Sequence, residues 1–399
     1  MDTKDLLEFD RRAREDGKRY KTARFILPQL LQEKGRHFIG IVGPRGVGKT
    51  VVLKQLAEQF KDSLYLSADT LGDHDLFDAV AALHDSYGIR AVLIDEIHFI
   101  SGYDAALKKI YDFLEVRVIF TSSVSLSIFA SAYDLSRRIR LVTLYPFSFR
   151  EFIYFKTGDH LEPLSLDQIA QGAIPSRYLR YEYLFDPYLQ GGCMPFSLDE
   201  PDVLSLLSNV VRTIISRDIP SVERLRIDEL GLIEKVVHFA GKAPVEDINY
   251  SSIARNVGIT KYKSEQYVGL LQKAFLLNPV FPAGTNVLRE PKMLFCLPYR
   301  LLYRSWADAV GGIREDYLTE SLRMAGYACA YLKSTRGQKT PDYLVERNGE
   351  CLVVEVGGRR KGREQFKGFA GKKAIVFAHG GGIQGIRRPL MSAGFLDAD

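Results

Sequence analysis

Short apolar runs alternate with amphipathic stretches through the first 145 residues. The apolar runs lie at 38–42, 63–67, 91–95, 116–123 and 139–144. The stretches between them repeat apolar residues at helical spacing, and they lie at 50–60, 75–87 and 103–113. Apolar runs of this length are typical of buried parallel strands. Their alternation with helices predicts an α/β domain built on a parallel sheet.

The pattern changes after residue 150. Residues 151–220 alternate loop-like and helical stretches, and prolines interrupt them at Pro163, Pro175, Pro187 and Pro195. Residues 228–240, 250–257 and 261–276 then have helical spacing, with a Gly258 turn and a Thr260 cap before the last of them. This order predicts a helix-turn-helix, to which residues 279–288 would add a wing hairpin.

The last hundred residues return to an α/β pattern. A helix at 313–325 precedes apolar strands at 328–333, 341–345, 351–357 and 373–379. Asn348-Gly349 is a strong hairpin signal between two of these strands. The predicted segments are therefore a core at 1–150, a helical lid at 151–220, a winged helix at 221–300 and a second α/β domain at 301–399.

Composition places the chain among ordinary globular proteins, with 46% hydrophobic and 26% charged residues. No apolar run approaches the roughly 20 residues of a membrane helix. Acids near the N-terminus are unlike a signal peptide, which predicts a cytoplasmic protein outside the membrane. Residues 301–399 hold 16 Lys and Arg against 11 Asp and Glu, so the net charge of +5 comes from this stretch. That excess fits either a nucleic-acid surface or a solvated basic face.

Residues 43–50 connect the first apolar run to the first amphipathic stretch. They are Gly43, Pro44, Arg45, Gly46, Val47, Gly48, Lys49 and Thr50, and Val51 follows. A glycine-rich loop between a strand and a helix N-terminus cradles phosphates with its backbone N–H groups. Lys49 is predicted to reach the β- and γ-phosphates, and Thr50 to ligate Mg²⁺. The loop therefore predicts binding of ATP with Mg²⁺; the alternative is a glycine-rich turn that binds nothing.

Two acids, Asp95 and Glu96, end the third apolar run. Carboxylates at the carboxyl end of a parallel strand face the ligand crevice of the sheet. We expect Asp95 to hold Mg²⁺ through water and Glu96 to polarise the water that attacks the γ-phosphate. A helix cap is the alternative interpretation.

Two further positions are candidates for catalysis. Thr121 lies at the tip of the next strand, where its hydroxyl is predicted to sense the γ-phosphate and orient the water; a turn cap is equally plausible. Arg137 and Arg138 precede the last strand of the core. An arginine there is a candidate arginine finger for a neighbouring subunit, which predicts a homo-oligomer. A surface arginine is the alternative.

These motifs resemble those of prokaryotic AAA+ ATPases of the archaeal-ATPase-like group. The resemblance lies in Gly-Pro-Arg-Gly-Val-Gly-Lys-Thr, Leu-Ile-Asp-Glu-Ile-His, Phe-Thr-Ser-Ser, Ser-Arg-Arg and Leu-Tyr-Pro-Phe-Ser-Phe-Arg-Glu-Phe, and in residues 185–195 and 215–219. It implies an ATPase with Arg138 as the finger, and packing roles for Phe147, Phe149 and Phe152. The group usually has glycine where Ser122 and Arg137 stand here. It also implies a C-terminal half of unknown function that often contains a restriction-endonuclease-like core.

In that C-terminal domain, Asp342 and Glu355 have the spacing of the PD-(D/E)XK nucleases. There two acids on adjacent strands hold Mg²⁺, and Glu315 is a candidate third ligand. Gly357 stands where those nucleases carry a lysine, and Lys361 is the nearest substitute. The alternative is a degenerate fold kept for DNA binding or scaffolding. The basic residues that would suit a phosphate backbone are Arg359, Arg360, Lys361 and Arg363.

The helix-turn-helix offers a second candidate surface for DNA. Residues that would face a duplex are Lys261, Tyr262, Lys263, Gln266 and Lys273. The alternative is a helix-turn-helix used only for packing. Three functions follow: an ATP-driven switch or motor on DNA, an ATP-gated signalling or assembly protein that binds a protein partner, and an ATP-regulated metal-dependent nuclease.

Overall fold

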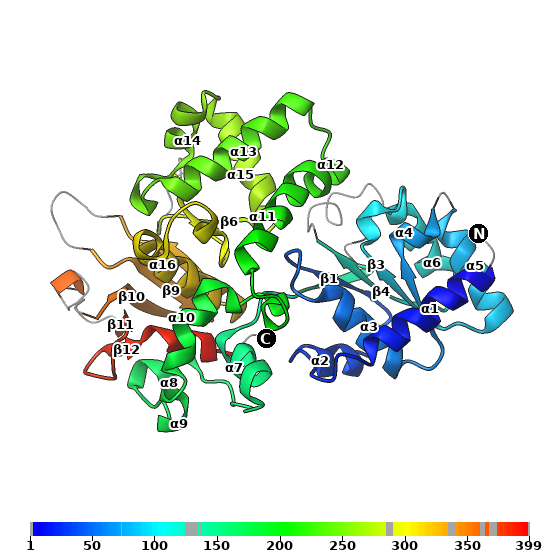
Figure 1. The fold of residues 1–399 in the computed structure, drawn as a ribbon, viewed down its shortest axis with the longest axis horizontal. Coiled ribbons are helices and arrows are strands. Elements are labelled where there is room, and N and C mark those ends of the chain that lie inside the picture. Colours follow the sequence, from blue (N-terminus) through cyan, green and yellow to red (C-terminus); the bar gives the residue numbers. More distant parts are fainter. Residues whose placement is uncertain are drawn as a thin grey trace. The chain divides into compact units, whose positions relative to one another are not determined.

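The computed structural model forms two compact units (Figure 1). It describes residues 3–72, 74–123, 135, 137–284, 290–333, 340–359, 364–366 and 373–397. The first unit comprises residues 1–145 and 212–225, and the second comprises 146–211 and 226–399. Residues 212–225 cover the end of the predicted lid and the start of the segment after it, yet they belong to the first unit.

The first unit is built on a five-stranded parallel sheet. Its strands are β1 (Phe38–Val42), β2 (Ser63–Ser67), β3 (Ala91–Asp95), β4 (Arg117–Ser122) and β5 (Ile139–Thr143). They lie in the order β2-β3-β4-β1-β5, and all residues of β1 and β3 are buried. The predicted parallel α/β core is confirmed.

Helices connect these strands. They are α1 (Thr3–Gly17), α2 (Leu27–Gln32), α3 (Lys49–Gln59), α4 (Ala68–Leu71), α5 (Leu76–Tyr87), the 3₁₀ helix η1 (Ile97–Phe99) and α6 (Tyr103–Phe113). The segment 212–225 adds the π-helix η5 (Ile214–Asp218) and α12 (Ile219–Val222). Local sequence sets the bounds of α5. The Asp75 side chain caps its first N–H groups, and Gly88 ends the helix at φ 67°.

The second unit begins with short helices. They are α7 (Phe149–Thr157), α8 (Leu166–Gln171), α9 (Ser176–Leu179), η2 (Glu182–Leu184), α10 (Phe185–Pro187), η3 (Tyr188–Gly192), η4 (Pro195–Leu198) and α11 (Val203–Thr213). Phe147, Phe149 and Phe152 are all buried there. The Phe149 ring lies 5.3 Å from the rings of both Phe185 and Tyr188, which confirms that these aromatics pack the core.

The predicted helix-turn-helix is present in this unit. It comprises α13 (Ile227–Lys242), η6 (Val245–Asp247), α14 (Tyr250–Val257) and α15 (Lys261–Lys273). Gly258 ends α14 at φ 77°, and the Thr260 hydroxyl accepts the Lys263 N–H at 3.2 Å. Strands β6 (Leu277–Val280) and β7 (Lys292–Phe295) pair antiparallel. The predicted wing begins within β6, and its residues 285–288 lie outside the described residues.

The C-terminal part contains a second sheet. Its elements are η7 (Tyr299–Leu302), α16 (Trp306–Met324), β8 (Ala328–Tyr331), β9 (Tyr343–Arg347), β10 (Glu350–Gly358), η8 (Glu364–Phe366), β11 (Lys373–His379), β12 (Arg387–Pro389) and η9 (Leu390–Phe395). The strand order is β12-β11-β10-β9-β8. Strands β8, β9 and β10 pair antiparallel, whereas β10, β11 and β12 pair parallel. Asn348 and Gly349 both have positive φ, as the predicted tight hairpin requires. No helix of the described ranges is long and apolar enough to cross a membrane.

Candidate nucleotide and magnesium site

The candidate site lies at one edge of the parallel sheet. Because β1, β3 and β4 run in the same direction, their carboxyl ends meet at that edge. The loop 43–48 follows β1, Glu96 follows β3, and β4 ends at Ser122. Ile41 and Val42 of β1 pair in register with Thr121 and Ser122 of β4. The fold therefore brings the loop, the acids and the hydroxyls together.

The loop itself depends on its glycines. Gly46 and Gly48 have φ of 86° and 87°, where a side chain would strain the backbone. A Cβ on Gly43 would lie 2.0 Å from the Leu144 carbonyl oxygen. Helix α3 begins directly after Gly48, and no side chain caps its N-terminus. The first N–H groups of this helix are therefore suited to bind an anion.

Lys49 lies beneath the loop and is only 4% exposed. Its Nζ donates to the carbonyl oxygens of Gly43 at 3.0 Å and Pro44 at 2.9 Å. Burial lowers the pKa of Lys49, while the charges of Glu96 and Asp95 act in the opposite direction. An anion beside this ammonium would stabilise its charged form. Its position fits the predicted role of binding phosphate.

Asp95 accepts hydrogen bonds from three hydroxyl groups. The Thr50 Oγ1 donates to its Oδ2 at 2.8 Å, and the Tyr65 hydroxyl donates to the same oxygen at 2.9 Å. The Thr121 hydroxyl donates to Oδ1. Burial, with the neighbouring Asp95 charge, raises the pKa of Tyr65. The predicted magnesium ligands Thr50 and Asp95 are thus in contact. Tyr65 was missed, because nothing in the β2 sequence distinguishes it from a packing residue.

Glu96 has a strained backbone, with φ 52° and ψ 48°. Such a conformation in a residue other than glycine costs about 1–3 kcal/mol and occurs often at functional sites. The Glu96 N–H donates to the Thr121 hydroxyl at 2.9 Å, and the Ser123 hydroxyl lies 3.2 Å from Glu96 Oε2. Thr121 is fully buried and contacts both acids. Its hydroxyl therefore positions Asp95 and Glu96, and a contact with the γ-phosphate stays a prediction.

Arg138 lies at the amino ends of the strands, whereas the candidate site lies at their carboxyl ends. It directly precedes β5, whose first residue Ile139 pairs with Phe38 at the start of β1. A five-residue strand, about 16 Å long, separates that edge from the loop. Arg138 Nη2 lies 3.1 Å from Asp112 Oδ1, and its guanidinium lies over the Tyr111 ring. Arg138 is therefore not brought to the site of its own chain, and its action on a neighbouring subunit stays a prediction.

Two arginines make contacts that were not predicted. Arg24 is 6% exposed and donates to the carbonyl oxygens of Val47 and Tyr145 at 2.7 and 2.9 Å. Arg45 of the loop forms a bidentate ion pair with the fully buried Asp218. Residues 215–219 had marked a sequence resemblance, but no pattern in them connected Asp218 with the loop.

The C-terminal acids Glu315, Asp342 and Glu355 have partners within the protein, and their role as metal ligands stays a prediction. No group of three or more His, Cys, Asp or Glu in the described parts of the chain is placed to hold a metal ion. Glu315 instead accepts from Lys292 and from the Tyr343 hydroxyl. The Asp342 N–H donates to Glu355 Oε2 at 3.1 Å, and Asp342 Oδ2 accepts from the Val356 N–H at 2.8 Å. These acids connect β9 to β10.

The basic residues after β10 are only partly described. Arg359 is exposed, whereas Arg360, Lys361 and Arg363 lie outside the described residues. The substitution of Lys361 for the lysine missing at Gly357 therefore stays a prediction.

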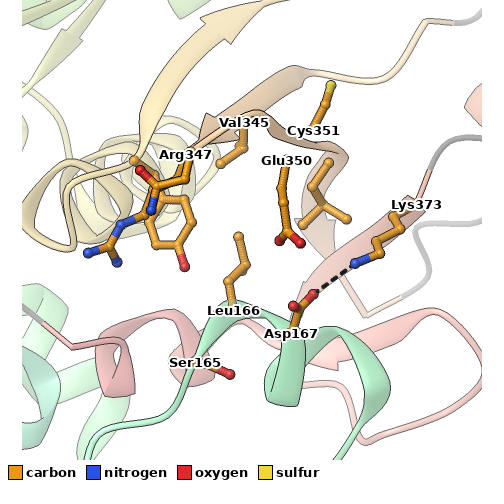
Figure 2. A pocket seen from close by; sticks show the side chains of 11 residues that line it. Ser165, Leu166, Asp167, Val345, Arg347, Glu350, Cys351 and Lys373 are labelled. Carbon is orange, nitrogen blue, oxygen red and sulfur yellow. Dashed lines mark hydrogen bonds and ion pairs between the residues drawn. The ribbon is translucent and has the colours of Figure 1, made fainter.

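The second unit also has two open hollows. One, of about 480 Å³, borders Asp342 and Lys292. The other, of about 400 Å³, lies between α8 and the β9–β10 hairpin, and Figure 2 shows its lining. There Lys373 forms an ion pair with Asp167 at 3.2 Å (Figure 2). Neither hollow brings the predicted acids together.

Two lysines of the predicted DNA surface are paired within the protein. Lys261 lies 2.6 Å from Glu290, and Lys263 forms an ion pair with Glu229 of α13. The Lys263 and Tyr267 side chains both contact Glu229, and their hydrogen bonds lower the pKa of Glu229 to about 2. Lys263 therefore joins α15 to α13. Tyr262, which is 67% exposed, and Gln266 lie on the outer face of α15.

Two uncharacterised proteins are similar to most of this chain. An uncharacterised protein of Methanocaldococcus jannaschii is 27% identical over 87% of this chain and 81% of its own length. An uncharacterised protein of Haemophilus influenzae is 25% identical over 83% of this chain and 85% of its own length.

Solved structures match with low identity. A Walker-type ATPase of Pyrococcus abyssi matches 66% of this chain and 90% of its own at 14% identity and a TM-score of 0.38. The Orc1 protein of Aeropyrum pernix, in complex with DNA, matches 77% of this chain and 92% of its own at 12% identity and a TM-score of 0.29. Residues 182–296 match a family model described as a domain of unknown function. Residues 35–153, which contain the loop, the acids and Arg138, match a family model described as an AAA domain.

Proposed function

We propose that this protein binds ATP with Mg²⁺, hydrolyses it, and uses the cycle as a nucleotide-dependent switch or motor on DNA. The observation that carries the proposal is the 2.8 Å contact between the Thr50 hydroxyl and Asp95, beside the buried Lys49. A hydroxyl, a carboxylate and a lysine at the N-terminus of a glycine-initiated helix match the needs of a metal-bound triphosphate.

Each residue has a role in this proposal. Lys49 exchanges its two loop carbonyl partners for phosphate oxygens, which stabilises its charged form. Thr50 and Asp95 would hold Mg²⁺, which would supply positive charge against the charge that develops on the phosphates. Glu96 orients and polarises the attacking water. Thr121 holds both acids, so the site is formed before the substrate arrives.

The catalytic cycle would be completed by an assembly of several copies. Because Arg138 lies at the edge of the sheet away from its own loop, it acts on a neighbouring chain if it acts as a finger. Mass determination with and without ATP tests this assembly. An ATP-dependent increase in mass that is lost in Arg138→Ala supports the proposal, whereas turnover by a monomer with unchanged rate in Arg138→Ala contradicts it.

Two observations support DNA as the partner. Residues 301–399 carry the chain's excess of basic residues, and α15 exposes the aromatic ring of Tyr262 beside Gln266. Basic surface binds the phosphate backbone, and an exposed aromatic side chain suits stacking or backbone contact. A protein partner is the alternative. The exposed face of α15 then serves as a protein-binding surface in an ATP-gated assembly.

The deciding experiment is ATP turnover with and without duplex and single-stranded DNA at two salt concentrations. We expect DNA to stimulate turnover less at the higher salt, because counterion release weakens binding. Tyr262→Ala should lower the ratio of stimulated to basal turnover. The matched control is Tyr87→Ala, an exposed tyrosine at the end of α5 in the first unit, which should keep that ratio. A rate of ATP turnover that DNA does not change favours a protein partner.

A further inference from the structure

A buried carboxylate lies against the phosphate loop. Asp218 is fully buried and ends the π-helix η5. Its two oxygens accept from Arg45, at 2.9 Å from Nε to Oδ2 and 2.6 Å from Nη2 to Oδ1. A bidentate pair of this kind fixes geometry as well as charge. A buried carboxylate depends on such a partner, so Arg45 is held on Asp218.

Ser123 lies between the Arg45–Asp218 ion pair and the proposed catalytic carboxylate of Glu96. Its Oγ lies 3.2 Å from Glu96 Oε2, 3.4 Å from Asp218 Oδ2 and 3.4 Å from His98 Nε2. A serine hydroxyl has one hydrogen to donate. Of the two carboxylates that this hydrogen can reach, Glu96 is the nearer, so we assign the hydrogen to Glu96. Burial lowers the pKa of His98, whose Nδ1 lies 3.3 Å from Glu96 Oε2.

The same helix makes a second contact beside Glu96. The Arg217 guanidinium lies 4.3 Å from the centre of the Phe99 ring. Phe99 belongs to η1, which begins immediately after Glu96. Two successive residues of η5 thus contact the phosphate loop and the turn that carries the catalytic acid. The chain enters residues 212–225 from the second unit and returns to it afterwards.

We propose that Asp218 is a positioning residue for ATP hydrolysis. It holds Arg45 in the bidentate pair and lies beside the Ser123 hydroxyl, which donates to Glu96. Together these contacts keep the Glu96 carboxylate oriented toward its water. This inference rests on the proposed ATPase function. It adds a residue from outside the AAA-matched stretch, 173 positions after Arg45, to the machinery of the site.

The test compares Asp218→Asn with Glu223→Gln. Glu223 lies five positions further in the same segment, and it is exposed, so its variant makes the same change of charge away from the site. We expect Asp218→Asn to lower kcat about 100-fold, since displacement of a catalytic group by an ångström has effects of that size. KM for ATP should not rise, because Lys49 and Thr50 are unchanged. Glu223→Gln should keep the wild-type kcat. A merely structural role would not separate kcat from KM in this way.

A double variant guards against misfolding. Asp218→Asn leaves the Arg45 charge without its partner, whereas Arg45→Gln with Asp218→Asn removes both charges. We expect the double variant to lose less kcat than the two single losses multiplied, because the residues act through one pair. The inference is overturned if folded Asp218→Asn keeps kcat within about twofold of Glu223→Gln, or if the single losses simply multiply.

The two proposals fail in different ways. Calorimetric titration of the wild type with ATP and MgCl₂ comes first, and no binding there would remove the ATPase proposal itself. Wild-type binding and turnover, together with an unaffected Asp218→Asn, would remove only the role of Asp218.

Discussion

Each unit of this protein places two acids near the ends of strands, yet the acids have different partners. In the first unit, Asp95 accepts from the side-chain hydroxyls of Thr50, Tyr65 and Thr121. In the second unit, Asp342 and Glu355 exchange hydrogen bonds with each other's strands through backbone N–H groups. The spacing of the acids predicts a metal site in both units, but hydroxyl partners surround the acid of the first unit, whereas backbone N–H groups contact the acids of the second.

The two kinds of hydrogen-bond partner differ in how easily a metal ion could replace them. A hydroxyl group can rotate away when a metal ion or its bound water approaches, and it can itself become a ligand. A backbone N–H in a sheet has no such freedom, and leaving it buried without a partner costs about 1–3 kcal/mol. The lysines differ in the same way. Lys49 donates to neutral carbonyls, whereas Lys292 is already paired with Glu315.

The largest expected effect is that of Lys49→Ala. Removing this buried ammonium takes away the cation that donates to the carbonyl oxygens of Gly43 and Pro44 beneath the loop. ATP binding measured by calorimetry and turnover should both be lost, by about 10³-fold or more if the charge-assisted contacts are worth about 4 kcal/mol together. Lys61→Ala, an exposed lysine after the same helix, is the matched control. Normal hydrolysis in Lys49→Ala would end the assignment of the site.

Glu96→Gln should separate binding from chemistry. The amide keeps the shape of the side chain and its contact with Ser123, but it cannot polarise water as a carboxylate does. Turnover should fall about 10²–10⁴-fold, the usual contribution of a general base. The calorimetric affinity for ATP with Mg²⁺ should stay near that of the wild type. If turnover is unchanged, another group acts as the base.

Another buried acid of the second unit, Glu320, should make the stability of the protein depend on pH. Burial raises the pKa of Glu320 in α16 to about 7, although Arg323 and the Leu297 N–H, which donates to Glu320 Oε2 at 2.8 Å, oppose this shift. The folded state therefore binds more protons than the unfolded state between pH 4.5 and 7, and this residue's contribution to stability falls as pH rises through that range.

Glu320→Gln should remove this loss of stability with rising pH. Relative to wild type, the variant should gain about 3 kcal/mol of unfolding free energy between pH 5 and pH 8. Denaturant melts of both proteins at the two pH values measure this difference. A difference that does not change with pH would show that Glu320 is not protonated in the folded state at pH 5.

The smallest effect is expected for Asp342→Asn. The change weakens the contact with the Val356 N–H, so the unfolding free energy should fall by about 2 kcal/mol while ATP turnover stays unchanged. Neither wild type nor variant should nick supercoiled DNA with Mg²⁺ or Mn²⁺. Metal-dependent nicking that disappears in Asp342→Asn would instead show that a metal displaces the backbone partners and that the nuclease hypothesis holds.

Local sequence determined much of this molecule. The five strands of the first unit, helices α3, α5 and α6, the phosphate loop and the acids at the end of β3 follow from short-range patterns, because apolar spacing, glycine and capping residues act within a few positions. The helix-turn-helix and the Asn348-Gly349 hairpin follow for the same reason. Parallel pairing then brings strand ends to one edge, which is why Thr50 and Asp95 were predicted as partners.

Tertiary structure alone decided the remaining partners. Asp218 meets Arg45 across 173 positions, Arg24 meets Val47 across 23, and Lys292 neutralises Glu315 before a metal could use it. No local pattern encodes these contacts, because a charged side chain looks the same in sequence whether it ends in solvent or in a buried pair. The cost of burying a charge without a partner selects the pairing only once the chain has folded.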